Sequence, residues 1–322
     1  MRNKIILRLV ELNRVLGMRR ACKAVLAKAT NNDLKYIQII KEYLTLQYDE
    51  LIKKSRIEFE TWNTKVHKSE EQLLLWTLWW QGYDQMPPIV KLCYQTQKKY
   101  AESKNAKLIL LTKDNISEYI DIPQIILQKV EKKNITITHF SDIIRIILIE
   151  QYGGAWIDST LLIDNSRWET HFENNDFFSF HLPAEVHIPS GTGQVLTECK
   201  WTGFMLYSKL PHNPLFVFLK ESIVDYWEKY DVLVDYFIMN FLIRVLYDNE
   251  EHAKDMIDLV EYNNPCLYDL NLIMNHKYEE DEWVSLKART NFFKLSWKEA
   301  YTKVDDEGHT TFYGKLCESL ED

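Results

Sequence analysis

The residue types best suited to chemistry lie in one segment, residues 139–162, which reads HFSDIIRIILIEQYGGAWIDSTLL. Asp142 and Arg145 are three positions apart, so on a helix they share one face. A carboxylate beside a guanidinium could bind sugar hydroxyls and a phosphate oxygen respectively. Asp158, followed two positions later by the hydroxyl of Thr160, suits a hard cation that neutralises a diphosphate. From spacing alone, an ordinary surface ion pair and a turn aspartate remain an open alternative.

A helix must position the first two of these residues. Apolar side chains between residues 140 and 148 follow the period of a helix with one buried face. Thr138 or Ser141 could cap this helix at its start. Gly153-Gly154 supplies the positive φ that ends it. We therefore expect a helix that stops abruptly and returns the chain to an extended conformation.

The extended piece that follows, residues 155–157, predicts a short buried strand with Asp158 at its carboxyl end. From residue 72 onward, strand and helix patterns alternate, which predicts an α/β fold with a mostly parallel sheet covered by helices. In open sheets of this kind the ligand crevice lies at the carboxyl ends of the strands. The other expected elements are strands over 73–80 and 107–112, helices over 89–101 (opened by Pro87-Pro88) and 123–130, an extended piece over 135–137, strands and loops over 176–210, and two helices over 213–248.

The N-terminal region, residues 1–66, is expected to be a helical segment ahead of a main domain at residues 67–322. Apolar residues are interleaved with Arg and Lys over 3–28, and a second helical pattern runs over 34–59. The turn residues at 30–33 separate the two patterns. The first pattern either packs against the main domain or lies as a basic amphipathic helix on an anionic membrane, and the sequence leaves both open.

Charge is distributed unevenly along the 322 residues. Residues 1–30 hold eight basic side chains and one acid, a net charge of +7, whereas the whole chain carries −8 and the remainder therefore −15. A body this acidic argues against a nucleic-acid binder. Hydrophobic residues make up 46% and charged residues 27% of the chain, proportions that are typical of a globular protein and argue against disorder.

Three further features bear on location. No apolar run approaches the roughly 18 residues of a membrane span. The N-terminus lacks the apolar stretch and cleavage site of a signal peptide. Five scattered cysteines without CxxC spacing indicate neither a disulfide framework nor a zinc finger. We expect a cytoplasmic protein, and the basic residues 1–30 are the candidate contact to the inner face of the cell membrane.

Four motifs in order carry a family resemblance: WWQG, PP-x-V-x-x-C, SDxxR and YGGxWxD. Together they resemble glycosyltransferase family 32 in its capsular-polysaccharide-synthesis branch. The resemblance is clear over residues 73–163 and returns at 235–237 and 293–298. It implies a GT-A fold, a Rossmann-like domain that binds a nucleotide-sugar donor. It also implies transfer of the sugar with retention at the anomeric carbon.

The resemblance also implies roles for individual residues. Asp142 and Arg145 match the pair that contacts the donor sugar and phosphate, and both are expected to be catalytic together with Asp158. Ser296 and Trp297 look like a C-terminal element that closes over the diphosphate. The residues expected to bind the donor are Trp79, Trp80, Gln81, Gly82, Ser141, Gly153, Gly154, Thr160, Asp235, Ser296 and Trp297. For Asp235, a role as a helix cap is the alternative.

The resemblance matches Asp158 to the first aspartate of a DXD metal motif, which implies a bound Mn²⁺ or Mg²⁺. The third position of that motif is Thr160, so one carboxylate is missing. Mg²⁺ accepts one or two carboxylates together with phosphate oxygens and waters, so a single aspartate remains workable. Asp164 and His309 are candidates for a substitute ligand.

These expectations favour a retaining glycosyltransferase that moves a hexose from a nucleotide sugar, with UDP-sugars first, to a glycan or lipid-linked acceptor in surface polysaccharide synthesis. No second carboxylate has a spacing that would favour double displacement. Gly191-Thr192-Gly193 is expected to be a loop on the acceptor side. The alternatives are a sugar-phosphate transferase of capsule synthesis and a carbohydrate-binding protein that has lost turnover.

Overall fold

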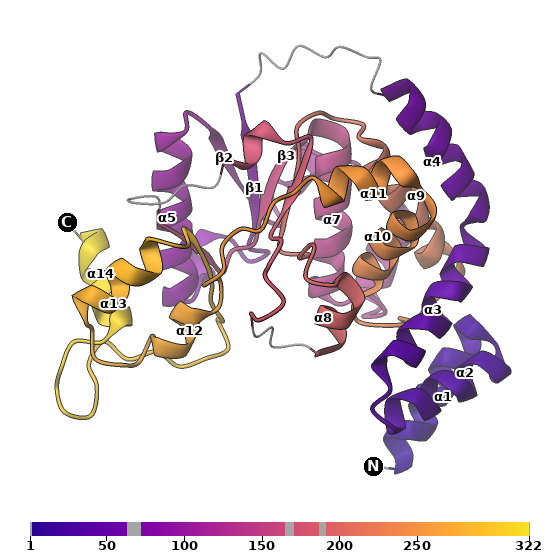
Figure 1. Cartoon of the computed structure of the whole chain (residues 1–322), viewed down its shortest axis with the longest axis horizontal. Coiled ribbons are helices and arrows are strands. Elements are labelled where there is room, and N and C mark those ends of the chain that lie inside the picture. The colour runs from indigo at the N-terminus through magenta and orange to yellow at the C-terminus, as the bar shows by residue number, and fades with distance from the viewer. Residues whose placement is uncertain (1, 63–71, 165–170, 187–190, 322) are drawn as a thin grey trace.

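A five-stranded sheet lies at the centre of the molecule (Figure 1). The computed structural model describes residues 2–62, 72–164, 171–186 and 191–321. The strands are β1 (Leu74–Leu78), β2 (Lys107–Leu111), β3 (Gly154–Ile157), β5 (Phe177–Ser179) and β6 (Met205–Ser208), in the order β2-β1-β3-β6-β5. β1 pairs in parallel with β2 and β3, and β6 runs antiparallel to β3 and β5. Four of the five strands point the same way, which confirms the predicted mostly parallel α/β sheet.

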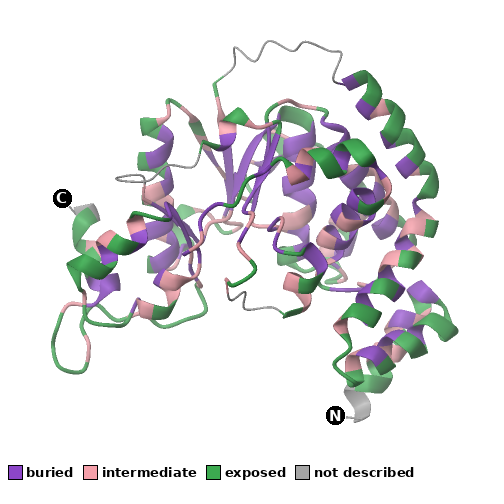
Figure 2. Ribbon diagram, viewed as in Figure 1, coloured by how far each residue is buried: buried purple, intermediate pink, exposed green. Residues whose placement is uncertain are grey.

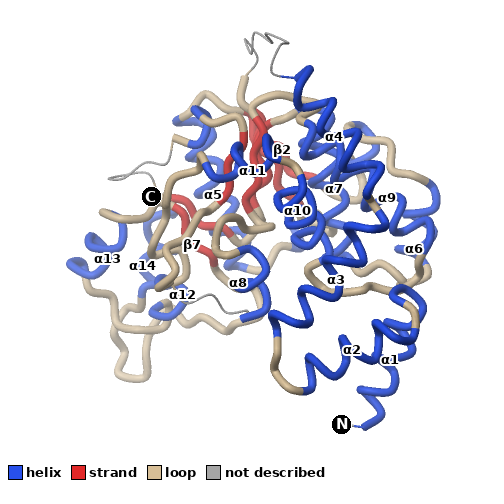
Figure 3. Tube along the Cα trace, turned by 45° about the vertical axis from the view of Figure 1, so that its right-hand side comes forward, coloured by secondary structure: helices blue, strands red, loops and turns tan. Residues whose placement is uncertain are grey.

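Helices cover both faces of this sheet (Figures 1 and 3). α5 (Pro88–Ser103) lies on one side, and α7 (Ile137–Tyr152) lies on the other with α9 (Pro214–Lys229) and α10 (Ile238–Asn249) packed behind it. The central strands β1 and β3 are consequently buried almost throughout, as Figure 2 shows. The remaining short helices are α6 (Gln124–Glu131), α8 (Gly191–Thr197), α11 (Glu251–Asp258), α12 (Asp269–Ile273), α13 (Glu280–Lys287) and α14 (Phe312–Glu321), with 3₁₀ turns at Tyr83–Gln85, Ile116–Glu118 and Phe172–Asn174.

A second, two-stranded sheet returns the C-terminal part of the chain to the segment after β3. β4 (Leu161–Ile163) pairs antiparallel with β7 (Phe292–Lys294), and the register sets Leu161 opposite Lys294. β4 packs against α5, and the apolar cluster beneath joins Val90, Cys93 and Phe293 to residues of the C-terminal helices. The small sheet therefore fixes residue 294 beside residues 158–160.

Four helices precede the sheet: α1 (Arg2–Leu16), α2 (Met18–Ala29), α3 (Asp33–Gln47) and α4 (Asp49–Trp62). They form the predicted helical region, although Gly17, with φ of 75°, breaks the first pattern into two helices. α4 packs on α9 and α3 packs on α10, so their apolar residues join the main core. The predicted boundary after residue 66 lies outside the described residues. Within the described part of the chain, every helix is too short or too polar to cross a membrane.

The start of α7 differs from the sequence-based expectation. The extended piece predicted over 135–137 is wrong, because Ile135 lies in a bend, the helix begins at Ile137 and Thr136 alone is extended. The N-cap of α7 is Thr136, whose side chain accepts a hydrogen bond from the backbone N–H three residues later, and not Thr138 or Ser141. Thr136 has the extended backbone of an N-cap, whereas the other two residues lie inside the helix.

The segment Gly191-Thr192-Gly193 forms the first turn of α8 and is not a loop, which corrects the prediction for these residues. Two glycines disfavour a helix by propensity, but α8 packs against α3 and α10. Thr192 Oγ1 also accepts a hydrogen bond from Lys28 Nζ at 2.8 Å. Tertiary contacts with the N-terminal helices therefore override the local preference.

Candidate functional site

The order of the strands defines where a ligand crevice should lie. From β1 the chain adds β2 on one side of β1 and then β3 on the other side. The order in which strands are added therefore reverses between β1 and β3. Ligands bind at such a switch point, outside the carboxyl ends of the strands. Trp79 directly follows β1, and Asp158 directly follows β3. Two of the sequence-predicted groups thus meet at this edge.

Helix α7 brings the predicted pair to the same edge. The chain reverses at Gly153-Gly154, so the first turns of α7 lie beside the last residues of β3. Asp142 Oδ1 is 3.2 Å from Arg145 Nη2, which confirms that these two side chains share a helix face. The same Nη2 atom is 3.5 Å from Asp158 Oδ1. One guanidinium therefore joins both predicted carboxylates.

Arg145 is held in place by several contacts and is only 6% exposed in its side chain. Its guanidinium donates hydrogen bonds to the carbonyl oxygen of Gly203 and, at 3.1 Å, to Ser141 Oγ. It also lies over the Trp156 ring, 4.9 Å from the ring centroid. Ser141 therefore orients the arginine in this structure, and the guanidinium is a fixed positive charge.

Asp158 accepts hydrogen bonds through both of its carboxylate oxygens. Oδ1 accepts from the Trp156 indole N–H at 2.8 Å, and Oδ2 accepts from Lys294 Nζ at 2.9 Å. Burial alone would raise the pKa of Asp158, but Lys294 and Arg145 outweigh it and hold that pKa below its usual value. Asp158 is consequently ionised at neutral pH.

Lys294 is a site residue that the sequence analysis did not single out. It is the last residue of β7, and its ammonium also donates to Thr160 Oγ1 at 2.7 Å. Residues 293–298 were noted for their family resemblance, but no local signal marked the lysine. Its role depends on the pairing of β4 with β7, in which Leu161 lies opposite Lys294 although they are 133 positions apart in the sequence.

Asp142 belongs to the charged cluster, and Tyr236 lies close to it. Burial raises the pKa of Asp142 to about 6; Arg145 opposes this shift and Asp158 adds to it. Tyr236 is 58% exposed as a whole residue. Partial burial of its hydroxyl, followed by the charges of Asp142 and Asp158, raises the pKa of that hydroxyl. Its ring packs edge-on against His139. From the sequence, Asp235 was the predicted donor-binding residue of the segment 235–237. In the structure, Tyr236 is the residue of this segment that lies close to the cluster.

Of the aromatic residues after β1, Trp79 contacts Trp297 in the C-terminal part of the chain. Trp79 lies edge-on to Trp297, with ring centroids 6.1 Å apart, and Trp297 is half exposed. Trp80 packs against Phe140 of α7. Gly82, with φ of 87°, closes a turn by donating its N–H to the carbonyl oxygen of Trp79 and leaves Gln81 exposed. The predicted strand over 73–80 ends at residue 78, so both tryptophans belong to this turn. Ser296 precedes Trp297, and its hydroxyl accepts from the backbone of Lys298.

Three predicted donor-binding residues lie elsewhere. Gly153 and Gly154 are at the amino end of β3, the end opposite to Asp158. A Cβ on Gly154 would lie 2.5 Å from the carbonyl oxygen of Leu74, so this glycine lets β3 approach β1. Asp235 accepts hydrogen bonds from the Tyr36 hydroxyl at 2.8 Å and from the backbone N–H of residue 237. We interpret both glycines and Asp235 as structural.

The side chains around Asp158 do not resemble the ligands of a metal site. Among the described residues, no group of three His, Cys, Asp or Glu side chains is placed to hold an ion. The proposed substitutes are engaged elsewhere: Asp164 faces Lys287 at 3.9 Å, and His309 pairs with Asp305 within its own turn. Thr160 binds an ammonium. The metal therefore remains a prediction, and the residues present do not fit it.

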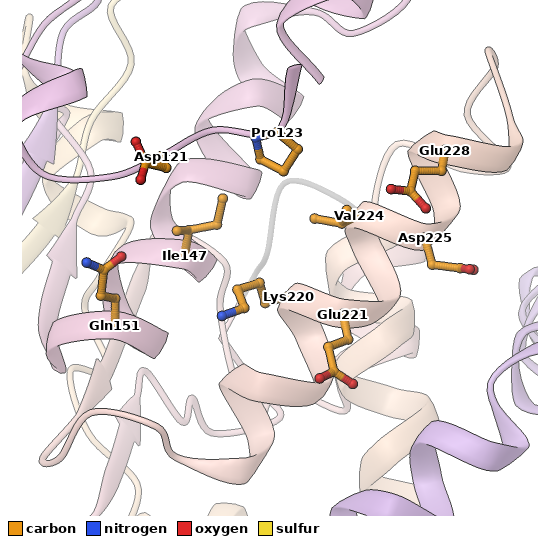
Figure 4. A pocket seen from close by; sticks show the side chains of 9 residues that line it. All are labelled: Asp121, Pro123, Ile147, Gln151, Lys220, Glu221, Val224, Asp225 and Glu228. Atoms are coloured by element: carbon orange, nitrogen blue, oxygen red, sulfur yellow. The ribbon is translucent and has the colours of Figure 1, made fainter. Parts of the chain in front are cut away.

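A separate cleft of about 450 Å³ lies between α7 and α9, with a contribution from the loop before α6 (Figure 4). Ile147 and Gln151 border it, and both lie in the C-terminal half of α7, beyond Asp142. Its carboxylates outnumber its one lysine: Asp121, Glu221, Asp225 and Glu228 against Lys220. Such a cleft repels phosphate groups, so it is unsuited to bind an anion.

The fold and site define a mixed α/β protein with two cations and two carboxylates clustered at the switch point of its sheet. A family model described as capsular polysaccharide synthesis protein matches residues 25–316. The chain therefore belongs to this capsular polysaccharide synthesis family, which confirms the predicted relation to capsular polysaccharide synthesis. Neither a curated protein nor a solved structure matches the chain.

Proposed function

We propose that this protein is a retaining glycosyltransferase of GT-A type, which transfers a hexose from a nucleotide sugar to a glycan or lipid-linked acceptor. The observation that carries the proposal is the cluster of Arg145, Lys294, Asp142 and Asp158 at the switch point of the sheet. Membership of the capsular polysaccharide synthesis family supports a biosynthetic transferase. UDP-sugars are the first donors to test.

Each part of the cluster has a task in this reaction. The guanidinium of Arg145 would bind the donor's diphosphate, because a buried, fixed cation attracts an anion strongly. Asp142 would accept hydrogen bonds from hydroxyls of the donor sugar. The half-exposed Trp297, edge-on to Trp79, offers an aromatic surface beside the nucleoside. Tyr236 is exposed beside the two carboxylates, and the acceptor would approach past it.

The proposed transfer takes place on one face of the sugar. The bond between the anomeric carbon and the β-phosphate oxygen breaks, and its electron pair stays on that oxygen. The acceptor oxygen forms the new bond on the same face, and its proton passes to the departing phosphate. Charge grows on the diphosphate as the bond breaks, so the fixed cations stabilise the transition state more than the ground state.

We further propose that α1 and α2 contact an anionic membrane that carries a lipid-linked acceptor. Ala21, Ala24 and Ala27 of α2 face the core. The exposed side chains of the two helices include the basic residues Arg19, Arg20 and Lys23. The exposed apolar residues are Ile5, Ile6, Leu7, Val10, Met18 and Leu26. This combination of apolar and basic residues is typical of helices that lie on an anionic membrane.

A nucleotide-release assay tests the enzymatic proposal. The purified protein is incubated with a panel of nucleotide sugars, with and without Mg²⁺ or Mn²⁺, and the released nucleotide is identified by chromatography. We expect a nucleoside diphosphate from one donor, since donors of such enzymes hydrolyse slowly even without an acceptor. Release of a nucleoside monophosphate would favour a sugar-phosphate transferase. Binding of a donor without any release would favour a carbohydrate-binding protein.

A further inference from the structure

Lys294 lies where a DXD-type metal ion would be expected. Its Nζ atom is 2.9 Å from Asp158 Oδ2 and 2.7 Å from Thr160 Oγ1. These two residues occupy the first and third positions of the motif that the sequence analysis identified. The ammonium is thus bound by the same two side chains that would have held a cation.

The surroundings of Asp158 leave little room for a second cation. Its Oδ1 accepts from Trp156 and faces Arg145, and its Oδ2 is taken by Lys294. A divalent ion on this carboxylate would meet two positive charges at its own ligand. Asp142 is paired with Arg145, so it supplies no free second carboxylate. Electrostatics therefore favour the ammonium over a metal in this position.

Lys294 retains the capacity to bind an anion. An ammonium has three N–H donors, and within the described part of the chain two of them bind Asp158 and Thr160. The third is left for a phosphate oxygen. The lysine side chain is 20% exposed, and it lies over the ring of Phe204, 4.7 Å from the centroid. It is therefore positioned by packing and still reachable by a ligand.

We infer that Lys294, together with Arg145, supplies the positive charge on the donor's diphosphate that a divalent cation would otherwise supply. Donor binding and turnover then need no metal. The inference rests on the proposed function and names a residue of the same site. As the bond to the β-phosphate oxygen breaks, the electron pair remains on the phosphate. The ammonium keeps its proton and stabilises that charge through a hydrogen bond.

Calorimetric titration of the wild-type protein with UDP, and with GDP where UDP does not bind, tests the metal directly. We expect the same dissociation constant, within about twofold, in excess EDTA and in excess Mg²⁺ or Mn²⁺. Binding that requires the metal, or that the metal tightens more than about tenfold, would overturn the inference and leave the proposed function standing. Absence of binding by any nucleoside diphosphate under every condition would count against the proposed function itself.

The variant Lys294→Gln tests the residue. Loss of one charged hydrogen bond to phosphate should weaken nucleotide binding in EDTA about 10- to 100-fold. Lys315→Gln, which removes an exposed lysine from α14, should bind as the wild type does. Thermal unfolding shows whether each variant is folded. Wild-type affinity in a folded Lys294→Gln variant would overturn the inference.

A second measurement keeps the inference testable where Lys294→Gln does not fold. Electron paramagnetic resonance of Mn²⁺ with the wild-type protein and UDP reports whether the protein adds ligands to the ion. We expect the spectrum of Mn²⁺ with UDP alone. A spectrum that shows protein ligands on the nucleotide-bound ion would overturn the assignment of Lys294.

Discussion

Among single residues, Asp158 is the carboxylate that contacts both cations of the site. Its carboxylate lies between Lys294 and Arg145, and its Oδ1 also accepts the indole N–H of Trp156. Removing the carboxylate would leave two cations without their shared partner and would release Lys294. Because preorganised charges contribute most when they are fixed, this residue should matter more for turnover than for folding.

Asp158→Asn is therefore expected to lower the rate of nucleotide release by about 10²- to 10³-fold. The asparagine keeps the size of the side chain, so the folded state should persist, as circular dichroism can verify. Asp255→Asn, an exposed change on α11, serves as the matched control and should leave the rate unchanged. Full activity of the Asp158→Asn variant would contradict the assignment of this site.

Asp142 gives a prediction on pH. Burial raises its pKa to about 6, opposed by Arg145 and supported by Asp158. Because the folded-state value exceeds the unfolded one, the folded state holds the proton more tightly. The associated stability is present below about pH 4 and is lost as the pH rises through about 6. The loss should be about 1 to 3 kcal/mol.

The variant Asp142→Asn removes this titration. Urea unfolding at about pH 4.5 and about pH 7 should show that the variant gains stability relative to the wild type as the pH rises, by about 1 to 3 kcal/mol. A stability difference that stays constant between the two pH values would contradict the raised pKa.

At the scale of elements, the junction between α7 and β3 sets the geometry of the site. Gly154 has φ of 80°, and a Cβ there would meet the Leu74 carbonyl oxygen of β1. Gly154→Ala should thus destabilise the protein by at least about 2 kcal/mol, through strain and displacement of β3. Gly308→Ala, with φ of 86° but open space around the Cβ, isolates the cost of the backbone angle. Equal losses in urea unfolding would show that the close approach of β1 and β3 contributes nothing.

The helices α1 and α2 give the second prediction at this scale. Arg19, Arg20 and Lys23 are exposed on α2. Since each basic residue near an anionic surface is worth about 1 kcal/mol, replacing all three by Gln should weaken binding to phosphatidylglycerol vesicles about 100-fold. Vesicles of phosphatidylcholine alone serve as the control. Unchanged binding in a sedimentation assay, or no binding by the wild type, would contradict the membrane contact.

In the whole molecule, local sequence patterns predicted those elements whose structure depends on neighbouring residues. Apolar periodicity, the pair Gly153-Gly154 and the strand before Asp158 identified the α7–β3 unit, and that unit fixes Arg145 against both carboxylates. The alternation of elements also predicted the sheet. Lys294 could not be predicted in this way, because its partners are more than 130 residues earlier and the β4–β7 register joins them.

Long-range packing also explains the other differences between sequence and structure. The glycines of residues 191–193 indicated a loop, but contacts with α3 and α10 stabilise a helix there. Asp235 was predicted on a local motif, whereas Tyr36 from the N-terminal helices takes its carboxylate. Residues that serve the site through distant partners therefore carry no signal in their own neighbourhood.

The central claim is that the switch point between β1 and β3 binds a nucleoside diphosphate through Arg145 and Lys294. A crystal structure of the wild-type protein with UDP, or with GDP where UDP does not bind, tests this most directly. We expect diphosphate oxygens within hydrogen-bond distance of both cations and the base beside Trp79. A nucleotide bound in the cleft between α7 and α9, or away from both cations, would contradict this claim.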